Sequence, residues 1–297
     1  MTNLGQLITA MITPFTTSGD VHYTEAVRVA THLVNNGTDT VLLSGTTGES
    51  PTLTHEEEFT LYKTIIDALP NQSIMVGTGS NSTKTAVEAT QKAEELGATA
   101  SLQVVPYYNK PSQAGLYQHF KTIASETTLP ILLYNIPGRT GTNLEPDTIA
   151  KLAELPTIIG IKEAAGSVTQ LIDIKNKTPD QFQLYSGDDA LTLDFLKNGA
   201  IGVVSVASHI VGPHIKTMIQ NFTDGDLSNA EVLEQTLMPI FNAMFITTNP
   251  VPVKFAMSYL GFEVGAPRLP LIDLTQKEKE RLTLVLDSNK HLLSHLA

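Results

Sequence analysis

The sequence predicts an α/β protein: a (β/α)8 TIM barrel with a helical extension at its C-terminal end. Three observations support this: eight short apolar runs of strand character, intervening segments long enough for one helix each, and helix-like sequence after the eighth run. Parallel strands need a crossover of about a dozen residues or more, usually a helix. Eight consecutive βα units therefore predict a closed barrel.

The predicted strands are short and apolar, and most end next to glycine, proline or a polar residue. They span residues 7–13, 40–44, 73–77, 101–106, 130–135, 158–162, 182–186 and 201–207. Because a barrel carries catalytic side chains at the C-terminal ends of its strands, the residues that close these runs are the candidates for a site.

Helix signals occur between the strands. Thr54 precedes His-Glu-Glu-Glu, which is typical of a helix start, and the segment 82–96 ends at Gly97 as a capped helix does. After the eighth strand the sequence is mostly helix-like to its end. We therefore expect residues 1–212 to form the barrel with its catalytic site, and residues 213–297 to form a helical region.

An open, doubly wound sheet is the alternative architecture. That fold typically carries a glycine-rich phosphate loop after an early strand. Neither G-x-G-x-x-G nor G-x-x-x-x-G-K-[ST] occurs in the sequence, which favours the barrel.

Composition excludes several classes of function. Thirty acidic and 19 basic residues give a formal net charge of −11, with no basic cluster suited to nucleic acid. The absence of cysteine excludes disulfides, thiolate metal sites and cysteine nucleophiles, and fits a cytoplasmic location. We expect no secretory signal and no membrane span. The histidines lack metal-ligand spacing, and no G-x-S-x-G motif predicts a serine hydrolase.

The sixth predicted strand ends in an amine. Ile158-Ile-Gly-Ile-Lys162-Glu163 places Lys162 at the end of an apolar run. Desolvation lowers the pKa of an amine and leaves more of it as the free base, which can attack a ketone to form an imine. Alternatively, Lys162 pairs with Glu163 on the rim, although successive strand residues point to opposite faces. Lys254 is a weaker candidate because it follows the eighth strand.

The second predicted strand closes with Ser44-Gly-Thr-Thr-Gly-Glu49. Backbone N–H groups and hydroxyls in such a turn can hold a small carboxylate. Glycine and threonine also form ordinary turns, and that interpretation stays open.

Two further strand ends carry aromatic and basic groups, in Pro106-Tyr-Tyr-Asn109 and Tyr134-Asn-Ile-Pro-Gly-Arg139-Thr-Gly141. A phenol relays protons when other hydroxyls bond to it, so Tyr134 could act with Thr46 and a second tyrosine. Core packing is the alternative for any single tyrosine. Arg139 is either a bidentate carboxylate ligand or a solvated loop charge.

Together these motifs resemble the dihydrodipicolinate synthase branch of the pyruvate-dependent lyase family. The motifs that match are Gly45-Thr-Thr-Gly-Glu49, Pro106-Tyr-Tyr-Asn109, the segment 134–141, Gly160-Ile-Lys-Glu163, Asn249-Pro-Val-Pro-Val-Lys254 and Arg268-Leu-Pro-Leu271. The resemblance implies condensation of pyruvate with L-aspartate 4-semialdehyde through a lysine Schiff base, giving 4-hydroxy-tetrahydrodipicolinate for lysine and diaminopimelate biosynthesis. It implies no metal or organic cofactor.

The resemblance also implies the pyruvate site. Lys162 would form the imine, and Thr46, Thr47 and the loop backbone would hold the carboxylate. Gly187 and Val204 would line the site through their backbones.

For the second substrate, the resemblance implies that Arg139 binds the carboxylate of the aldehyde. Tyr134, Thr46 and Tyr108 would relay protons, with Tyr108 reaching into the site of a neighbouring subunit. A homo-oligomer follows, a tight dimer and usually a dimer of dimers.

Two other functions stay open. A related lyase acting on a sugar acid, such as N-acetylneuraminate lyase, would share Lys162, Tyr134, Thr46 and Thr47, but that branch generally lacks the equivalent of Arg139. A catalytically silent barrel that binds a keto acid is the other, because fold alone does not establish catalysis.

Relatives inhibited by L-lysine bind it at a dimer interface. This chain matches their pattern at Ser50, His55, Asn81 and Tyr107, but has Glu58 in place of a second histidine and Thr85 in place of a glutamate. The resemblance therefore implies weak or absent inhibition.

Overall fold

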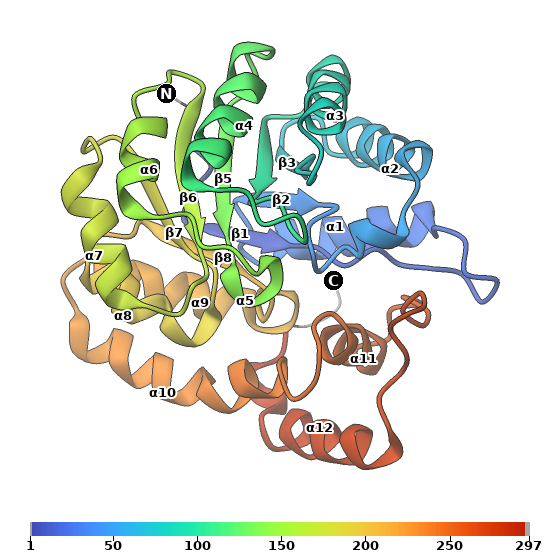
Figure 1. Cartoon of the computed structure of the whole chain (residues 1–297). Helices are drawn as coiled ribbons and strands as arrows, with labels where there is room; N and C mark the ends of the chain where they lie inside the picture. Colours follow the sequence, from blue (N-terminus) through green and yellow to red (C-terminus); the bar gives the residue numbers. More distant parts are fainter. Residues whose placement is uncertain (1, 295–297) are drawn as a thin grey trace.

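The computed structural model describes residues 2–294 and confirms the predicted barrel. Eight parallel strands pair in chain order, and β1 also pairs with β8 to close the barrel (Figure 1). The strands are β1 Leu7–Ala10, β2 Thr40–Leu43, β3 Ser73–Gly77, β4 Ala100–Val104, β5 Ile131–Asn135, β6 Ile158–Glu163, β7 Gln183–Ser186 and β8 Gly202–Ser205.

Helices surround the barrel. They are α1 Tyr23–Asn35, α2 His55–Ala68, α3 Thr83–Glu95, α4 Gln113–Ser125, α5 Pro137–Thr140, α6 Pro146–Leu152, α7 Val168–Lys177, α8 Thr192–Lys197, α9 Ser208–Thr223, α10 Leu227–Ala243, α11 Val251–Tyr259 and α12 Gln276–Ser288. Three single 3₁₀ turns, η1 Ser50–Thr52, η2 Asp189–Leu191 and η3 Lys290–Leu292, complete the assignment. Within residues 2–294, no helix is long and apolar enough to cross a membrane.

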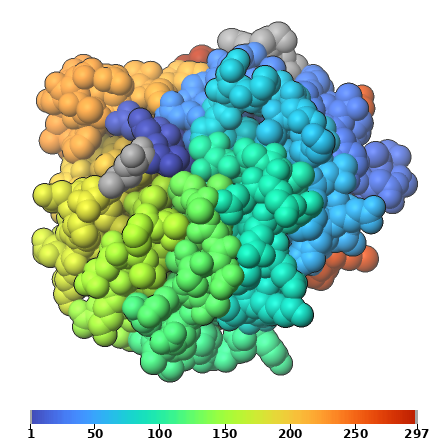
Figure 2. All heavy atoms as spheres, turned by 90° about the horizontal axis from the view of Figure 1, so that it is seen from above, coloured from blue at the N-terminus to red at the C-terminus, as the bar shows by residue number. Residues whose placement is uncertain are grey.

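The strands bury both faces. Alternate residues such as Ile8, Leu42, Met75 and Leu132 fill the barrel interior, while the intervening residues pack under the helices. The N-terminal segment closes the end where the strands begin: Leu4 is buried there, and Figure 2 shows this segment in dark blue, ringed by the other elements. The opposite end is left for the site.

Two predicted helix boundaries are confirmed. Thr54 caps α2 in a reciprocal capping box with Glu57, and Ser82 caps α3 through the amide of Thr85. Gly97 follows α3 with φ +87°, a conformation that glycine adopts without strain.

The predicted first and eighth strands are too long. β8 ends at Ser205 because the next two amides, of Val206 and Ala207, donate to the buried carboxylate of Asp189 instead of to a neighbouring strand. β1 ends at Ala10, and the amide of Met11 still donates to the carbonyl of Leu42.

The helical extension, α10 to α12, lies along one side of the barrel (Figure 1). The last barrel helix, α9, begins at Ser208 and is kinked at Val211, so the expected division after residue 212 falls inside it. That division remains a prediction. The two predicted regions include Met1 and residues 295–297, which lie outside the described residues.

Candidate functional site

The structure places the predicted amine inside the barrel. Lys162 on β6 is in register with Tyr134 on β5, and its Nζ lies 4.1 Å from the centre of the tyrosine ring. Lys162 is only 6% exposed, and its amine forms no hydrogen bond or ion pair with any described residue. No other described side chain occupies the lone pair of this amine, so the amine is sterically and chemically available to a carbonyl carbon that enters beside Tyr134.

Glu163 lies on the other face of β6, as strand alternation requires. Its carboxylate accepts hydrogen bonds from Asn135 Nδ2 at 3.0 Å, Gln170 Nε2 at 3.1 Å and the Ala165 amide at 2.6 Å. Burial raises the pKa of the Glu163 carboxyl, and these bonds oppose that change. The alternative in which Glu163 pairs with Lys162 on the rim is therefore wrong.

Gly187 lies beside the side chain of Lys162. A Cβ added to Gly187 would lie 3.1 Å from Lys162 Cε and 2.6 Å from Ala164 Cβ, so the missing side chain leaves space beside the lysine. Val204 on β8 belongs to the same interior cluster as Tyr134. That the two residues line the pyruvate site through their backbones stays a prediction.

A cavity of about 460 Å³ opens at the C-terminal ends of the strands next to this amine. Three of the predicted residues line it: Thr46 from the loop after β2, Tyr134 from β5 and Arg139 from the short helix α5 that follows β5. Lys162 is not part of its lining and lies against the ring of Tyr134 instead. Thr47 is buried beside Thr46 and contacts Asn249.

Tyr108 does not lie in this cavity. Its side chain is 89% exposed, and its backbone has a φ of 74°, a strained value for a residue with a side chain. The preceding Tyr107 is 40% exposed and does line the cavity. Within one subunit, Tyr108 is thus presented outward, away from the other predicted relay residues.

These features agree with the comparisons to known proteins. The model of the dihydrodipicolinate synthetase family matches residues 3–289. The chain belongs to this family. 4-Hydroxy-tetrahydrodipicolinate synthases from Cyanothece sp. and Thermosynechococcus vestitus are 52% and 53% identical to it, each covering 97% of this chain, and 99% and 98% of the relative.

Solved structures of family members have the same fold. Dihydrodipicolinate synthase from Cyanidioschyzon merolae, crystallised with lysine bound, superposes with a TM-score of 0.95 at 46% identity, covering 96% of this chain and 98% of that one. The enzyme from Bacillus anthracis also gives 0.95, at 43% identity, covering 97% and 99%.

Lys254, the rival lysine, is engaged elsewhere. Its amine lies 2.8 Å from Glu49 Oε1, and the two side chains are 2% and 1% exposed. Burial lowers the pKa of Lys254, and the Glu49 carboxylate opposes this shift. The second carboxylate oxygen of Glu49 accepts from the Arg268 amide at 2.8 Å. This lysine holds the end of the β2 loop and does not face the cavity at the strand ends.

Sequence reasoning missed two residues of this region. Glu49 ends one of the motifs and Asn249 begins another, and the motifs by themselves predict no role for either residue. The signal was present, because both motifs belong to the family pattern. However, nothing local indicates that the two segments touch.

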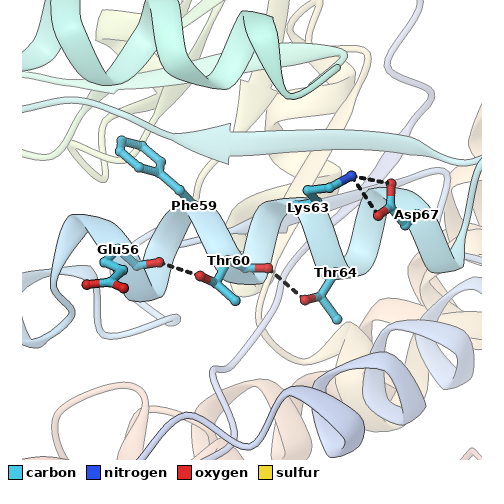
Figure 3. A pocket seen from close by; sticks show the side chains of 6 residues that line it. All are labelled: Glu56, Phe59, Thr60, Lys63, Thr64 and Asp67. Atoms are coloured by element: carbon cyan, nitrogen blue, oxygen red, sulfur yellow. Dashed lines mark hydrogen bonds and ion pairs between the residues drawn. The ribbon is translucent and has the colours of Figure 1, made fainter.

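A second hollow in the structure is not a candidate site. A shallow hollow runs along the exposed face of α2 (Figure 3), where Lys63 pairs with Asp67, and the hydroxyls of Thr60 and Thr64 donate to carbonyls of the same helix. These groups serve the helix and lie outside the barrel. No group of metal-ligating side chains occurs in the part of the chain that the structure describes.

Proposed function

We propose that this protein condenses pyruvate with L-aspartate 4-semialdehyde to form 4-hydroxy-tetrahydrodipicolinate, the step that commits carbon to diaminopimelate and lysine. The observation that carries this is the buried, unpaired amine of Lys162 beside Tyr134, at a cavity that also presents Thr46 and Arg139. Borohydride reduction with pyruvate, followed by intact mass measurement and an assay with the semialdehyde, tests it. A product with sugar-derived aldehydes instead would favour the sugar-acid branch.

The chemistry follows from these groups. The amine of Lys162, in its unprotonated form, adds to the ketone of pyruvate. Loss of water, with uptake of one proton through the hydroxyl relay, gives a protonated imine. The imine withdraws electrons, so a proton leaves the methyl group and the enamine attacks the aldehyde carbon. The amine of the second substrate then closes the ring and releases Lys162. The lysine acts as the electron sink throughout, with no metal or organic cofactor.

The remaining roles are positional. Thr46, Thr47 and the loop amides would hold the pyruvate carboxylate, while Gly187 and Val204 shape the space around the imine. Tyr134 lies against the amine and lines the cavity, which suits a group that passes protons between imine and solvent. We place the enzyme in the cytoplasm as a homo-oligomer, a dimer or dimer of dimers.

We expect Tyr108→Phe to reduce turnover while retaining the oligomer. The 89% exposed, strained Tyr108 would complete the proton relay of a neighbouring subunit. Mixing Tyr108→Phe with Lys162→Ala protein under subunit exchange should restore part of the activity. Some sites then combine an intact Lys162 from one subunit with an intact Tyr108 from the other. Exchange without rescue would place Tyr108 outside the neighbouring site.

We expect Arg139→Ala to weaken use of the aldehyde much more than formation of the pyruvate adduct. Only the second substrate loses a charged partner, at a cost of about 1.5–3 kcal/mol, or roughly 10- to 150-fold in affinity. The KM of each substrate, measured with the other saturating, checks this. Equal damage to both would indicate a collapsed loop.

L-Lysine is expected to inhibit weakly or not at all. Ser50, His55, Glu58 and Thr85 line the same cavity, and the Glu58 carboxylate already accepts from Ser50 Oγ at 2.8 Å and contacts His55 Nδ1 at 3.2 Å. Without a glutamate at position 85, the α-ammonium group of a bound L-lysine lacks a free carboxylate partner. Half-inhibition below about 1 mM would contradict this, and Thr85→Glu should strengthen inhibition.

A further inference from the structure

Asn249 joins the helical extension to both substrate-binding elements. Its Nδ2 lies 2.9 Å from Thr47 Oγ1, and its backbone oxygen lies 3.5 Å from Arg139 Nη2. Asn249 is 6% exposed and Thr47 is 2% exposed, although 202 residues separate them in the chain. One residue thus contacts the groups assigned to each substrate carboxylate.

The direction of the first hydrogen bond constrains Thr47. An amide nitrogen only donates, so Thr47 Oγ1 is the acceptor in this contact. A threonine hydroxyl has a single hydrogen, and with Nδ2 beside the oxygen this hydrogen must point elsewhere. The hydroxyl is therefore available to donate to another group.

The loop that carries Thr47 is also fixed at its end. Glu49 is held by Lys254 Nζ and by the Arg268 amide, each at 2.8 Å. Both holding groups come from the same extension as Asn249. Because this end of the loop is anchored, the orientation of the Thr47 hydroxyl depends on Asn249 more than on loop movement.

A contribution to stability does not by itself explain why an asparagine occupies position 249. Its Oδ1 is buried and has no hydrogen-bond partner among residues 2–294. An unsatisfied buried amide oxygen destabilises a fold, so an apolar residue would be better tolerated here if packing were the only requirement.

We propose that Asn249 is a positioning residue that orients the Thr47 hydroxyl as a hydrogen-bond donor to the carboxylate of the keto-acid substrate. The inference rests on the proposed function and extends it to the C-terminal extension. A donor already aimed at the anion needs no reorganisation when pyruvate binds. Asn249 would thus control pyruvate affinity without touching the substrate.

Exchanging the donor for an acceptor tests this most sharply. In Asn249→Asp the Thr47 hydroxyl would turn to the new carboxylate, and pyruvate would lose a donor and meet a negative charge. We expect the KM for pyruvate to rise about 50-fold or more, against about 5-fold for Asn249→Ala, with kcat at saturating pyruvate changing far less. The KM for the semialdehyde should change little, since Arg139 contacts the backbone of Asn249.

A matched control separates charge from position. Asn71→Asp makes the same chemical change at an exposed residue just before β3, at the opposite end of the barrel, and should leave both KM values unchanged. An unchanged pyruvate KM in Asn249→Asp would mean that the oxygen of Asn249 faces Thr47, and would overturn the proposal.

A double-mutant cycle decides whether Asn249 acts through Thr47. Thr47→Val should raise the pyruvate KM about 10-fold, and adding Asn249→Ala should then change it less than about 2-fold. Additive effects would overturn the inference and leave the lyase assignment intact. An unchanged KM in Thr47→Val would overturn it together with the role of Thr47. Failure of wild-type protein to form a borohydride adduct would instead remove the proposed function itself.

Discussion

Lys162→Ala should abolish the borohydride-stable adduct with pyruvate and lower kcat about 10³-fold or more. No lysine among the described residues lines the cavity itself, and Lys162 is the one that lies against the ring of Tyr134, a lining residue. The protein should still fold, since the amine of Lys162 makes no hydrogen bond or ion pair with residues 2–294. Intact mass after reduction and circular dichroism measure the two effects.

Lys162→Arg is the matched control for this experiment. Its guanidinium stays protonated and therefore cannot add to a ketone, so it should restore neither the adduct nor turnover. Peptide mapping of the wild-type adduct should locate the label on Lys162. A label on Lys254 would contradict the assignment, and the Glu49 ion pair that engages this amine makes such a result unexpected.

Glu49→Gln should destabilise the protein by about 3–5 kcal/mol, because it leaves the buried charge of Lys254 without a counter-charge. Urea unfolding at a fixed protein concentration measures this loss. Glu88→Gln provides the comparison, since Glu88 pairs with Lys84 at 3.7 Å with both side chains exposed, and should cost less than about 1 kcal/mol.

The same variant should show a distinct pH dependence. Burial already lowers the pKa of Lys254, and loss of Glu49 removes the group that opposes this shift. The unfolded state then binds more protons than the folded state between the lowered pKa and the unfolded value of about 10.4. Stability should therefore rise with pH through this window. The double variant Glu49→Gln, Lys254→Met should lack this dependence and recover most of the lost stability; if it does not, the buried charge is not the cause.

Local sequence was sufficient for most of the barrel. Apolar runs separated by helix-length segments gave all eight strands, and strand alternation indicated that Lys162 and Glu163 face opposite sides. The boundaries of β8 could not be predicted in the same way, because they depend on Asp189, whose carboxylate binds amides 17 and 18 residues further on.

The candidate site was likewise predictable from local sequence only in part. The sequence by itself determined the order of the strands and the placement of Thr46, Tyr134, Arg139 and Lys162 at their ends, because side-chain direction in a strand and the polarity of a barrel follow from local pattern. Only the tertiary structure decided which of the two lysines, Lys162 or Lys254, is engaged in an ion pair. Lys254 is held by Glu49, 205 residues away, and a contact over that distance depends on how the extension packs against the barrel, which no local pattern encodes.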